Sequence, residues 1–351
     1  MNQAYRIFVF IGFFVWMITG TGCREIVTTT VIHQDGSCVR TVRVTSSSQE
    51  MSSSAFPVPT DSSWEITTTK SRSDSSRFVY TATKSFTNVE DLAAEYLPKD
   101  SSRLHLDIQI TLQKNFQWFF TYFTYTESYK KTFPFNKVPI SSYITPEELD
   151  AYLNNQDSTG LKDKISEYET RSIYEEFYQG LLGAIKTHPA PGIDSLLVIR
   201  KKEQLYQTLL NSEDADSSNE FADTFIPQTA QVLGASLPQF VRDTLRTITK
   251  HIETKLDFFG DINANSYHNI LVMPGTVLRA NADSTSGDTI TWNLDGKEFS
   301  YQDYSMWAES RVTNWGTVII AALIVMLFFS LSRKMQSTGR KSVGTPEEGT
   351  D

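Results

Sequence analysis

Alternating side-chain oxygens at Asp261, Asn263 and Asn265 form the most suggestive cluster for binding a metal ion. An EF-hand loop begins with this Asp-x-Asn-x-Asn spacing because oxygens at positions 1, 3 and 5 coordinate calcium. The rest of the loop departs from the pattern, since Ser266 replaces the required glycine and Val272 stands where the bidentate glutamate belongs. The segment is therefore interpreted as a polar turn after a helix, and no metal site or cofactor is predicted.

The histidines do not fall into a catalytic or metal-binding spacing. The chain has five, none of them in an His-Glu-x-x-His arrangement: His33, His105, His188, His251 and His268. A Gly-x-Ser-x-Gly elbow and a phosphate-binding glycine loop are also missing from the sequence. The acidic run at 211–220 is interpreted as a solvated loop. No catalytic residue is predicted.

The two cysteines have alternative chemistries. Cys23 follows Thr21-Gly22 behind an apolar run, as the acylated cysteine does in a bacterial lipobox, although Gly20 stands where many lipoboxes carry leucine. Lipidation of Cys23, with palmitate among its acyl chains, would leave Cys38 as an unpaired thiol on a strand. Without lipidation, a Cys23–Cys38 disulfide is the alternative in an oxidising compartment.

Aromatic side chains crowd the segment 116–125 on both faces of an expected strand. A strand that is apolar on both faces is usually buried on both, which favours a sheet covered on one side by helices. The alternative is a groove for a lipid or another apolar ligand. One face would line it with Phe116, Trp118, Phe120 and Tyr122.

The first residues resemble a targeting segment. Arg6 supplies the positive charge of a short n-region. Ile7–Ile18 is an apolar stretch that is too short to span a bilayer comfortably. Small residues follow it. This layout predicts a secretory signal peptide over residues 1–22, with an uncleaved short anchor as the alternative.

A second apolar segment predicts a transmembrane helix over residues 315–332. Val318–Phe329 has neither charge nor proline, and Trp315 stands where an interfacial aromatic anchor is expected. Arg333, Lys334, Arg340 and Lys341 follow closely. The positive-inside rule then places the tail 333–351 in the cytoplasm and residues 24–314 outside it, in a bacterial cytoplasmic membrane. The alternative is a buried core helix.

Charge and composition limit the partners of the polar bulk. The formal net charge of −9 argues against binding of nucleic acid or of anionic lipid by this region. The region also has no Asn-x-Ser/Thr sequon, which favours a bacterial over a eukaryotic secreted protein.

The elements that position these residues begin as β structure. Ile26–His33 and Val39–Val44 read as a hairpin around an Asp-Gly turn. Leu104–Leu112 alternates apolar and polar residues, which predicts a half-buried strand, and a turn at Lys114-Asn115 would lead into an aromatic strand over Phe116–Tyr129.

A helical region then interrupts the β pattern. Thr145-Pro146-Glu147-Glu148 predicts a capping box, and a later helix capped by Ser236 would end at Gly260. Short strands return after it. We therefore expect an α+β fold, in which an antiparallel sheet of N- and C-terminal strands, 23–144 and 261–314, carries a helical insertion at 145–260. Two separate domains are the alternative.

The terminal β segments and anchors resemble the LppM-type bacterial envelope lipoproteins. The resemblance rests on the lipobox-like Cys23, the early Asp-Gly-Ser hairpin, the segment Met273–Val277, Ala280-Asn281-Ala282 with Thr291-Trp292, and the closing apolar helix. It covers roughly the first 45 residues and 269–332, and leaves out the helical middle. It implies an anchored, β-rich extracytoplasmic domain without a catalytic assignment.

These observations favour a membrane-anchored envelope lipoprotein whose extracytoplasmic domain is a non-enzymatic interaction or scaffold module for an unknown envelope protein or lipid. A module that binds a lipid or apolar ligand is the first alternative. A hydrolase with an unrecognised site is the less favoured one.

Overall fold

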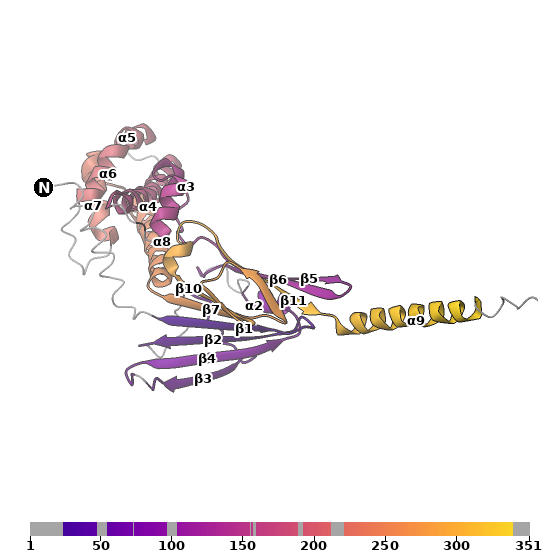
Figure 1. The fold of residues 1–351 in the computed structure, drawn as a ribbon. Helices are drawn as coiled ribbons and strands as arrows, with labels where there is room; N and C mark the ends of the chain where they lie inside the picture. The colour runs from indigo at the N-terminus through magenta and orange to yellow at the C-terminus, as the bar shows by residue number, and fades with distance from the viewer. Residues whose placement is uncertain are drawn as a thin grey trace, which may run out of the picture.

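The fold combines two β-sheets with a bundle of helices and one long C-terminal helix (Figure 1). The computed structural model describes residues 24–47, 55–72, 74–96, 104–154, 156, 159–188, 192–211 and 221–339. The predicted signal peptide, Cys23, most of the acidic run and the end of the tail lie outside the described residues.

The larger sheet has seven strands in the order β3-β4-β2-β1-β7-β10-β9. Their bounds are β1 Glu25–Ile32, β2 Cys38–Ser46, β3 Glu65–Lys70, β4 Phe78–Phe86, β7 Ser266–Val272, β9 Ser284–Ser286 and β10 Thr289–Asp295. All neighbouring strands are antiparallel except β1 and β7, which run parallel. N-terminal and C-terminal segments thus meet in the middle of one sheet.

The smaller sheet has four antiparallel strands in the order β5-β6-β11-β8. These are β5 Ile108–Gln117, β6 Phe120–Tyr129, β8 Thr276–Ala280 and β11 Tyr304–Thr313. Its buried face joins the larger sheet and the short helix α2 (Val89–Glu95) in one hydrophobic core. Strand β6 alternates strictly between buried and half-buried residues, as expected for a strand with one face in a core.

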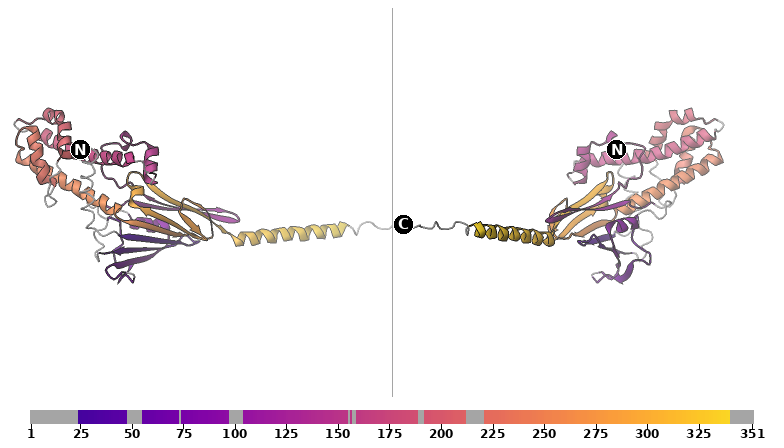
Figure 2. Two further views of the ribbon diagram at one scale, coloured as in Figure 1. Left: turned by 60° about the vertical axis from the view of Figure 1, so that its left-hand side comes forward. Right: turned by 90° about the vertical axis from the view of Figure 1, so that its right-hand side faces the viewer.

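The helices α3 to α8 form a second core of their own. They are α3 Pro146–Leu153, α4 Thr159–Thr187, α5 Ser195–Arg200, α6 Lys202–Asn211, α7 Phe221–Leu233 and α8 Gln239–Asn263. The 3₁₀ turn η1 Ile140–Ser142 precedes α3, and the 3₁₀ turn η2 Gly296–Phe299 follows β10 and contacts α8. The long helices α4 and α8 pack on each other. Figure 2 shows this bundle set at one end of the sheets.

The two ends of the sheets have different neighbours. Strands β1 and β7 both start beside the bundle, because Glu25 pairs with Ser266 directly after α8. At the opposite end, Thr313 pairs with Phe120, and helix α9 (Trp315–Gly339) follows after a single residue. The bundle and α9 therefore leave the sheets at opposite ends (Figures 1 and 2).

The predicted α+β class, with N- and C-terminal strands sharing a sheet around a helical insertion, is confirmed. The structure divides the strands between two sheets and adds a parallel pair. The parallel pair arises because the helical insertion returns the chain to the end where β1 began, so β7 leaves in the same direction.

The predicted turn at Lys114-Asn115 is wrong. Strand β5 continues to Gln117, and the hairpin turns at Trp118-Phe119. The expectation that the aromatic strand is buried on both faces is also wrong, because the bundle lies beyond the end of the sheet and leaves the second face of β6 half-exposed.

Of the predicted helix ends, the capping box is confirmed and the bounds of the last bundle helix are wrong by a few residues. The capping box forms as predicted, with Thr145 accepting from the backbone N–H of Glu148 and the Glu148 carboxylate accepting from that of Thr145. Helix α8 has Pro238 rather than Ser236 as its N-cap residue and continues past Gly260 to Asn263. Gly260 is buried inside the helix, and the turn after it packs on η2, where Gly296 lies beside the backbone of Ile262 and Asn263.

Candidate functional site

The four aromatic residues expected to line a ligand groove lie on the β5–β6 hairpin. Phe116 and Trp118 are exposed at its tip, whereas Phe120 and Tyr122 are half-buried and pack with ring centroids 6.4 Å apart. They come together along one hairpin rather than around the pocket described next.

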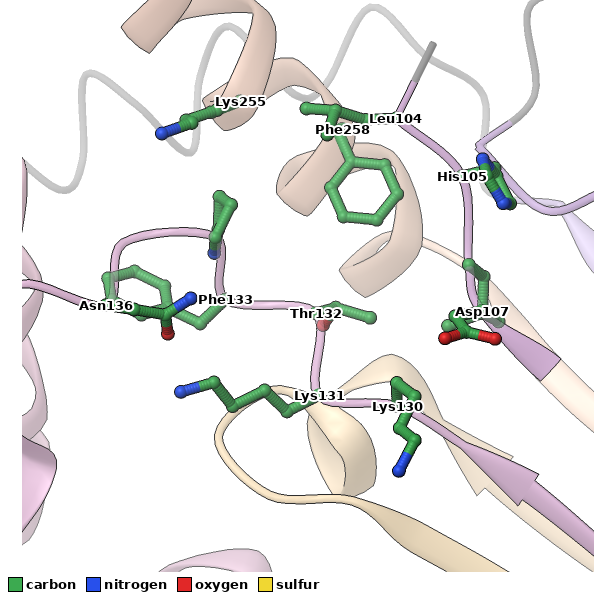
Figure 3. A pocket seen from close by; sticks show the side chains of 12 residues that line it. Leu104, His105, Asp107, Lys130, Lys131, Thr132, Phe133, Asn136, Lys255 and Phe258 are labelled. Atoms are coloured by element: carbon green, nitrogen blue, oxygen red, sulfur yellow. The ribbon is translucent and has the colours of Figure 1, made fainter. Parts of the chain in front are cut away.

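A pocket of about 280 Å³ lies where the sheets meet the bundle (Figure 3). Two chain segments and helix α8 form it: the stretch entering β5, the stretch leaving β6, and the part of α8 that carries Lys255 and Phe258. Phe133 and Phe258 give it apolar walls, while His105 and Lys131 also line it. Among the histidines, only His105 contributes to this lining within the described residues.

Two lysines of this pocket have carboxylate partners. Lys130 pairs with Asp303 and Lys255 with Glu176, each at 2.8 Å. The backbone N–H of Lys131 also donates to Asp303 at 3.0 Å. Aromatic walls with lysines at the rim suit an amphiphile, whose apolar body would be covered while an anionic group meets Lys131.

The most concentrated polar cluster is buried between the two sheets. Arg40 on β2 forms a bidentate ion pair with Glu127 on β6, with N–O distances of 2.8 and 2.9 Å. Tyr125 and Tyr129 donate to the same carboxylate at 2.6 and 3.1 Å. Arg40 also donates to the hydroxyl of Tyr96, the C-cap residue of α2. The cluster therefore joins both sheets and α2.

The electrostatics of this cluster are those of a closed ion pair. Burial by itself opposes ionisation of Glu127, but the charge and hydrogen bonds of Arg40 outweigh it and hold the pKa of the Glu127 carboxyl below its usual range. Burial, with the neighbouring Glu127 charge, raises the pKa of Tyr125 and Tyr129 well above the usual value. Since every charged atom has a partner and both side chains are buried, we interpret the cluster as a structural link.

Sequence reasoning missed this ion pair, although a signal exists. Arg40 falls at the same alternation as Cys38 and Val42, and Glu127 at the same alternation as Tyr125 and Tyr129. A charged residue on the apolar face of each of two strands is the pattern that could have indicated a buried pair.

The residues of the calcium-like segment have structural partners. Asp261 pairs with Arg24 at 2.7 Å and accepts from the backbone N–H of Ala55. Asn265 accepts from the backbone N–H of Arg24. These contacts fasten the start of β1 to the end of α8. Within the part of the chain that the structure describes, no group of three or more His, Cys, Asp or Glu residues could hold a metal ion.

Cys38 is a buried thiol at the start of β2. Burial raises its pKa to about 11, which leaves very little thiolate at neutral pH and makes it a poor nucleophile. The lipidation and disulfide predictions both involve Cys23, which lies outside the described residues.

The described residues thus define an α+β protein with a two-sheet core, a helical bundle and one exposed apolar helix. No protein-family model matches the chain, and no curated protein matches it. A solved structure with some similarity is the NMR structure of the folded domain of LppM from Mycobacterium tuberculosis, at 8% identity and a TM-score of 0.30. The match covers 85% of this chain and 94% of that one. Similarity at this level shows neither family membership nor function.

Proposed function

We propose that this chain is a membrane-anchored bacterial envelope protein, and that its extracytoplasmic domain is a non-enzymatic interaction or scaffold module. The observation that carries the proposal is helix α9, which leaves the folded domain directly and contributes nothing to its cores.

Helix α9 has the length and composition of a membrane span. Its segment Trp315–Arg333 comprises 19 residues with a mean hydropathy of 2.3, and none of it is buried against the rest of the protein. At 1.5 Å per residue this segment is about 28 Å long, close to the thickness of a bilayer's hydrocarbon core. A core helix of a soluble domain would instead bury its apolar side chains.

The basic residues after this segment support one orientation. Arg333, Lys334, Arg340 and Lys341 would stay in the cytoplasm under the positive-inside rule, with the sheets and the bundle on the other side of the bacterial cytoplasmic membrane.

The helical bundle offers a surface for a partner at the end away from α9. Leu196 and Ile199 on α5 are large apolar side chains exposed to solvent, as is Phe240 at the start of α8. Leu196 and Ile199 are three residues apart and therefore lie on one face of α5, and neighbouring exposed apolar side chains often mark an interaction site.

The test is to solubilise the full-length protein in mild detergent and identify what co-purifies. We expect a stoichiometric protein partner that is lost in Leu196→Glu/Ile199→Glu and retained in Gln207→Glu, a matched change on the neighbouring exposed face of α6. Loss of the partner in both variants, or in neither, would contradict this surface. A preparation with no protein partner would contradict the scaffold function.

A ligand-binding module is the second candidate, favoured by the pocket between the sheets and the bundle. Native mass spectrometry of the full-length protein in detergent would then show a retained lipid that is lost in Phe258→Glu. A protein that carries no lipid would leave this candidate without support.

Lipidation of Cys23 is part of the proposal and has its own test. We expect one thiol to be titrated when the protein is unfolded in urea without reductant. Unfolding exposes the buried Cys38 thiol, whereas the lipid blocks the thiol of Cys23. Two thiols would mean an unmodified Cys23, and none would mean the Cys23–Cys38 disulfide. Labelled fatty acid should be absent from Cys23→Ala.

A further inference from the structure

The tip of the β5–β6 hairpin is an exposed aromatic cluster. Phe116, Trp118 and Phe119 leave 61%, 77% and 44% of their surface open to solvent. Farther along the same hairpin, Phe123 and Tyr125 of β6 are fully covered by the core. The tip is exposed because the hairpin extends beyond the end of the core.

This tip is joined to the first turn of α9 by a set of hydrogen bonds. The side chains of Asn314 and Thr317 both donate to the carbonyl oxygen of Trp118, at 3.0 and 2.6 Å. The backbone N–H of Asn314 donates to the carbonyl of Phe119 at 2.8 Å, and Thr121 donates to the Asn314 side chain at 2.9 Å. The tip and the start of α9 therefore form one unit (Figure 1).

The backbone of the tip suits a medium with little water. An unpaired carbonyl is costly to remove from water, but those of Trp118 and Phe119 already have donors from α9. Trp118 also adopts a φ of +43°, a left-handed conformation that is unfavourable for a large side chain. The contacts with α9 hold this residue in a conformation that presents its ring outward.

Cations lie just behind the aromatic tip. Lys114 lies 5.4 Å from the ring centre of Phe123 and donates to the carbonyl of Gln34, and Arg311 lies 4.4 Å from the ring centre of Phe120. Lys114 precedes the tip by two residues on β5, and Arg311 on β11 pairs with Tyr122 of β6. Aromatic rings at the boundary, with basic groups beside them, are the composition found at the interface of a bilayer.

We propose that the tip, residues 116–119, inserts into the interfacial layer of the membrane that α9 spans, and so forms a second membrane contact that fixes the tilt of the domain. This proposal rests on the proposed function, because it requires α9 to be in the bilayer. Trp315, exposed in the first turn of α9, lies in the same aromatic layer. The partner of the tip is lipid rather than a protein, because the tip lies directly beside the start of the membrane-spanning helix α9.

The test places spin labels on the full-length protein in vesicles of phosphatidylcholine and phosphatidylglycerol. The parent is Cys23→Ala, in which buried Cys38 stays unlabelled in the folded state. Labels go on Trp118→Cys at the tip, on Val325→Cys in the middle of α9, and on Leu196→Cys, an exposed apolar position on the bundle. The ratio of accessibility to oxygen over accessibility to a water-soluble nickel complex reports depth in the bilayer.

We expect the highest ratio at position 325 and a low ratio at the control position 196. At position 118 the ratio should be several-fold higher than at position 196. A high ratio at 325 with a control-like ratio at 118 would overturn the tip contact and leave the span intact. A low ratio at 325 would overturn the proposed function and this inference with it.

A second label keeps the test valid if the Trp118 variant does not fold. Phe116→Cys changes a tip residue whose side chain takes no part in the hydrogen bonds to α9. It should give the same high ratio as position 118. A folded Phe116→Cys variant with a control-like ratio would also overturn the tip contact.

Discussion

At the scale of single residues, the buried carboxyl group of Glu127 and the half-buried carboxyl group of Glu169 have opposite environments. Glu127 is paired with Arg40 and keeps its charge inside the core. Glu169 on α4 has a hydrogen bond from Tyr301, and burial raises its pKa to about 7. The first group is therefore charged across the physiological range, and the second changes charge within it.

The ion pair predicts a strong dependence of one partner on the other. Arg40→Met should lower the free energy of unfolding by about 3–5 kcal/mol, because it leaves Glu127 buried without a counter-charge. The double variant Arg40→Met/Glu127→Leu should recover most of this loss. Thermal unfolding of the full-length protein in detergent measures both. Equal losses in the single and double variants would contradict the coupling.

Glu169 predicts a pH dependence of stability. Its pKa is about 7 in the fold and 4.5 ordinarily, so the folded state binds the proton more tightly than the unfolded state does. The contribution of Glu169 to stability is then fully present below about pH 4.5 and is lost as pH rises through 7, by at most about 3 kcal/mol. Glu169→Gln should flatten this part of the profile. A profile unchanged by the substitution would show that Glu169 titrates normally.

At the scale of elements, the close contact between α4 and α8 requires a residue without a side chain, Gly180, at the point where they meet. A Cβ on Gly180 would lie 2.3 Å from Cδ1 of Ile248 on α8. Because α8 leads directly into β7, this close packing also helps to orient the bundle on the sheets.

Two glycines of α4 make a matched pair for testing this contact. Gly183→Ala should raise the free energy of unfolding by up to about 1 kcal/mol, since alanine favours helix and a Cβ there meets nothing within 4 Å. Gly180→Ala should not raise the free energy of unfolding, because the Ile248 side chain must move to make room. Gly180→Ala/Ile248→Val should recover part of the expected gain, because valine is smaller. Thermal unfolding of the three variants decides. Equal gains at both glycines would mean that the helices separate freely.

At the scale of the whole molecule, the start of β1 and the start of α9 lie at opposite ends of the sheets. Strand β1 has 8 residues, which at about 3.3 Å each separates these ends by roughly 26 Å. A lipid on Cys23, the residue before Arg24, would therefore attach far from the α9 end.

This arrangement predicts how the domain stands on the membrane. In the Cys23→Ala parent, which carries no lipid at that position, a spin label on Glu25→Cys should remain accessible to water while α9 lies in lipid, in the same vesicles as above. Lipid contact at position 25 would instead mean that the sheets lie along the membrane, held at both ends. The Leu196→Cys label on the bundle serves as the water-exposed reference.

Local patterns were sufficient to predict the capping box at Thr145 and the apolar helix near the C-terminus, because each depends on residues a few positions apart. The order of β and helical patterns along the chain was sufficient for the α+β class with a helical insertion. The Arg40–Glu127 pair, separated by 87 residues, and the bond from Thr317 to Trp118, separated by 199, could be found only in the folded structure. Such contacts depend on which strands become neighbours and on where each sheet ends. The aromatic segment shows the consequence, because its pattern indicated a strand but not whether its tip would be buried or face a membrane.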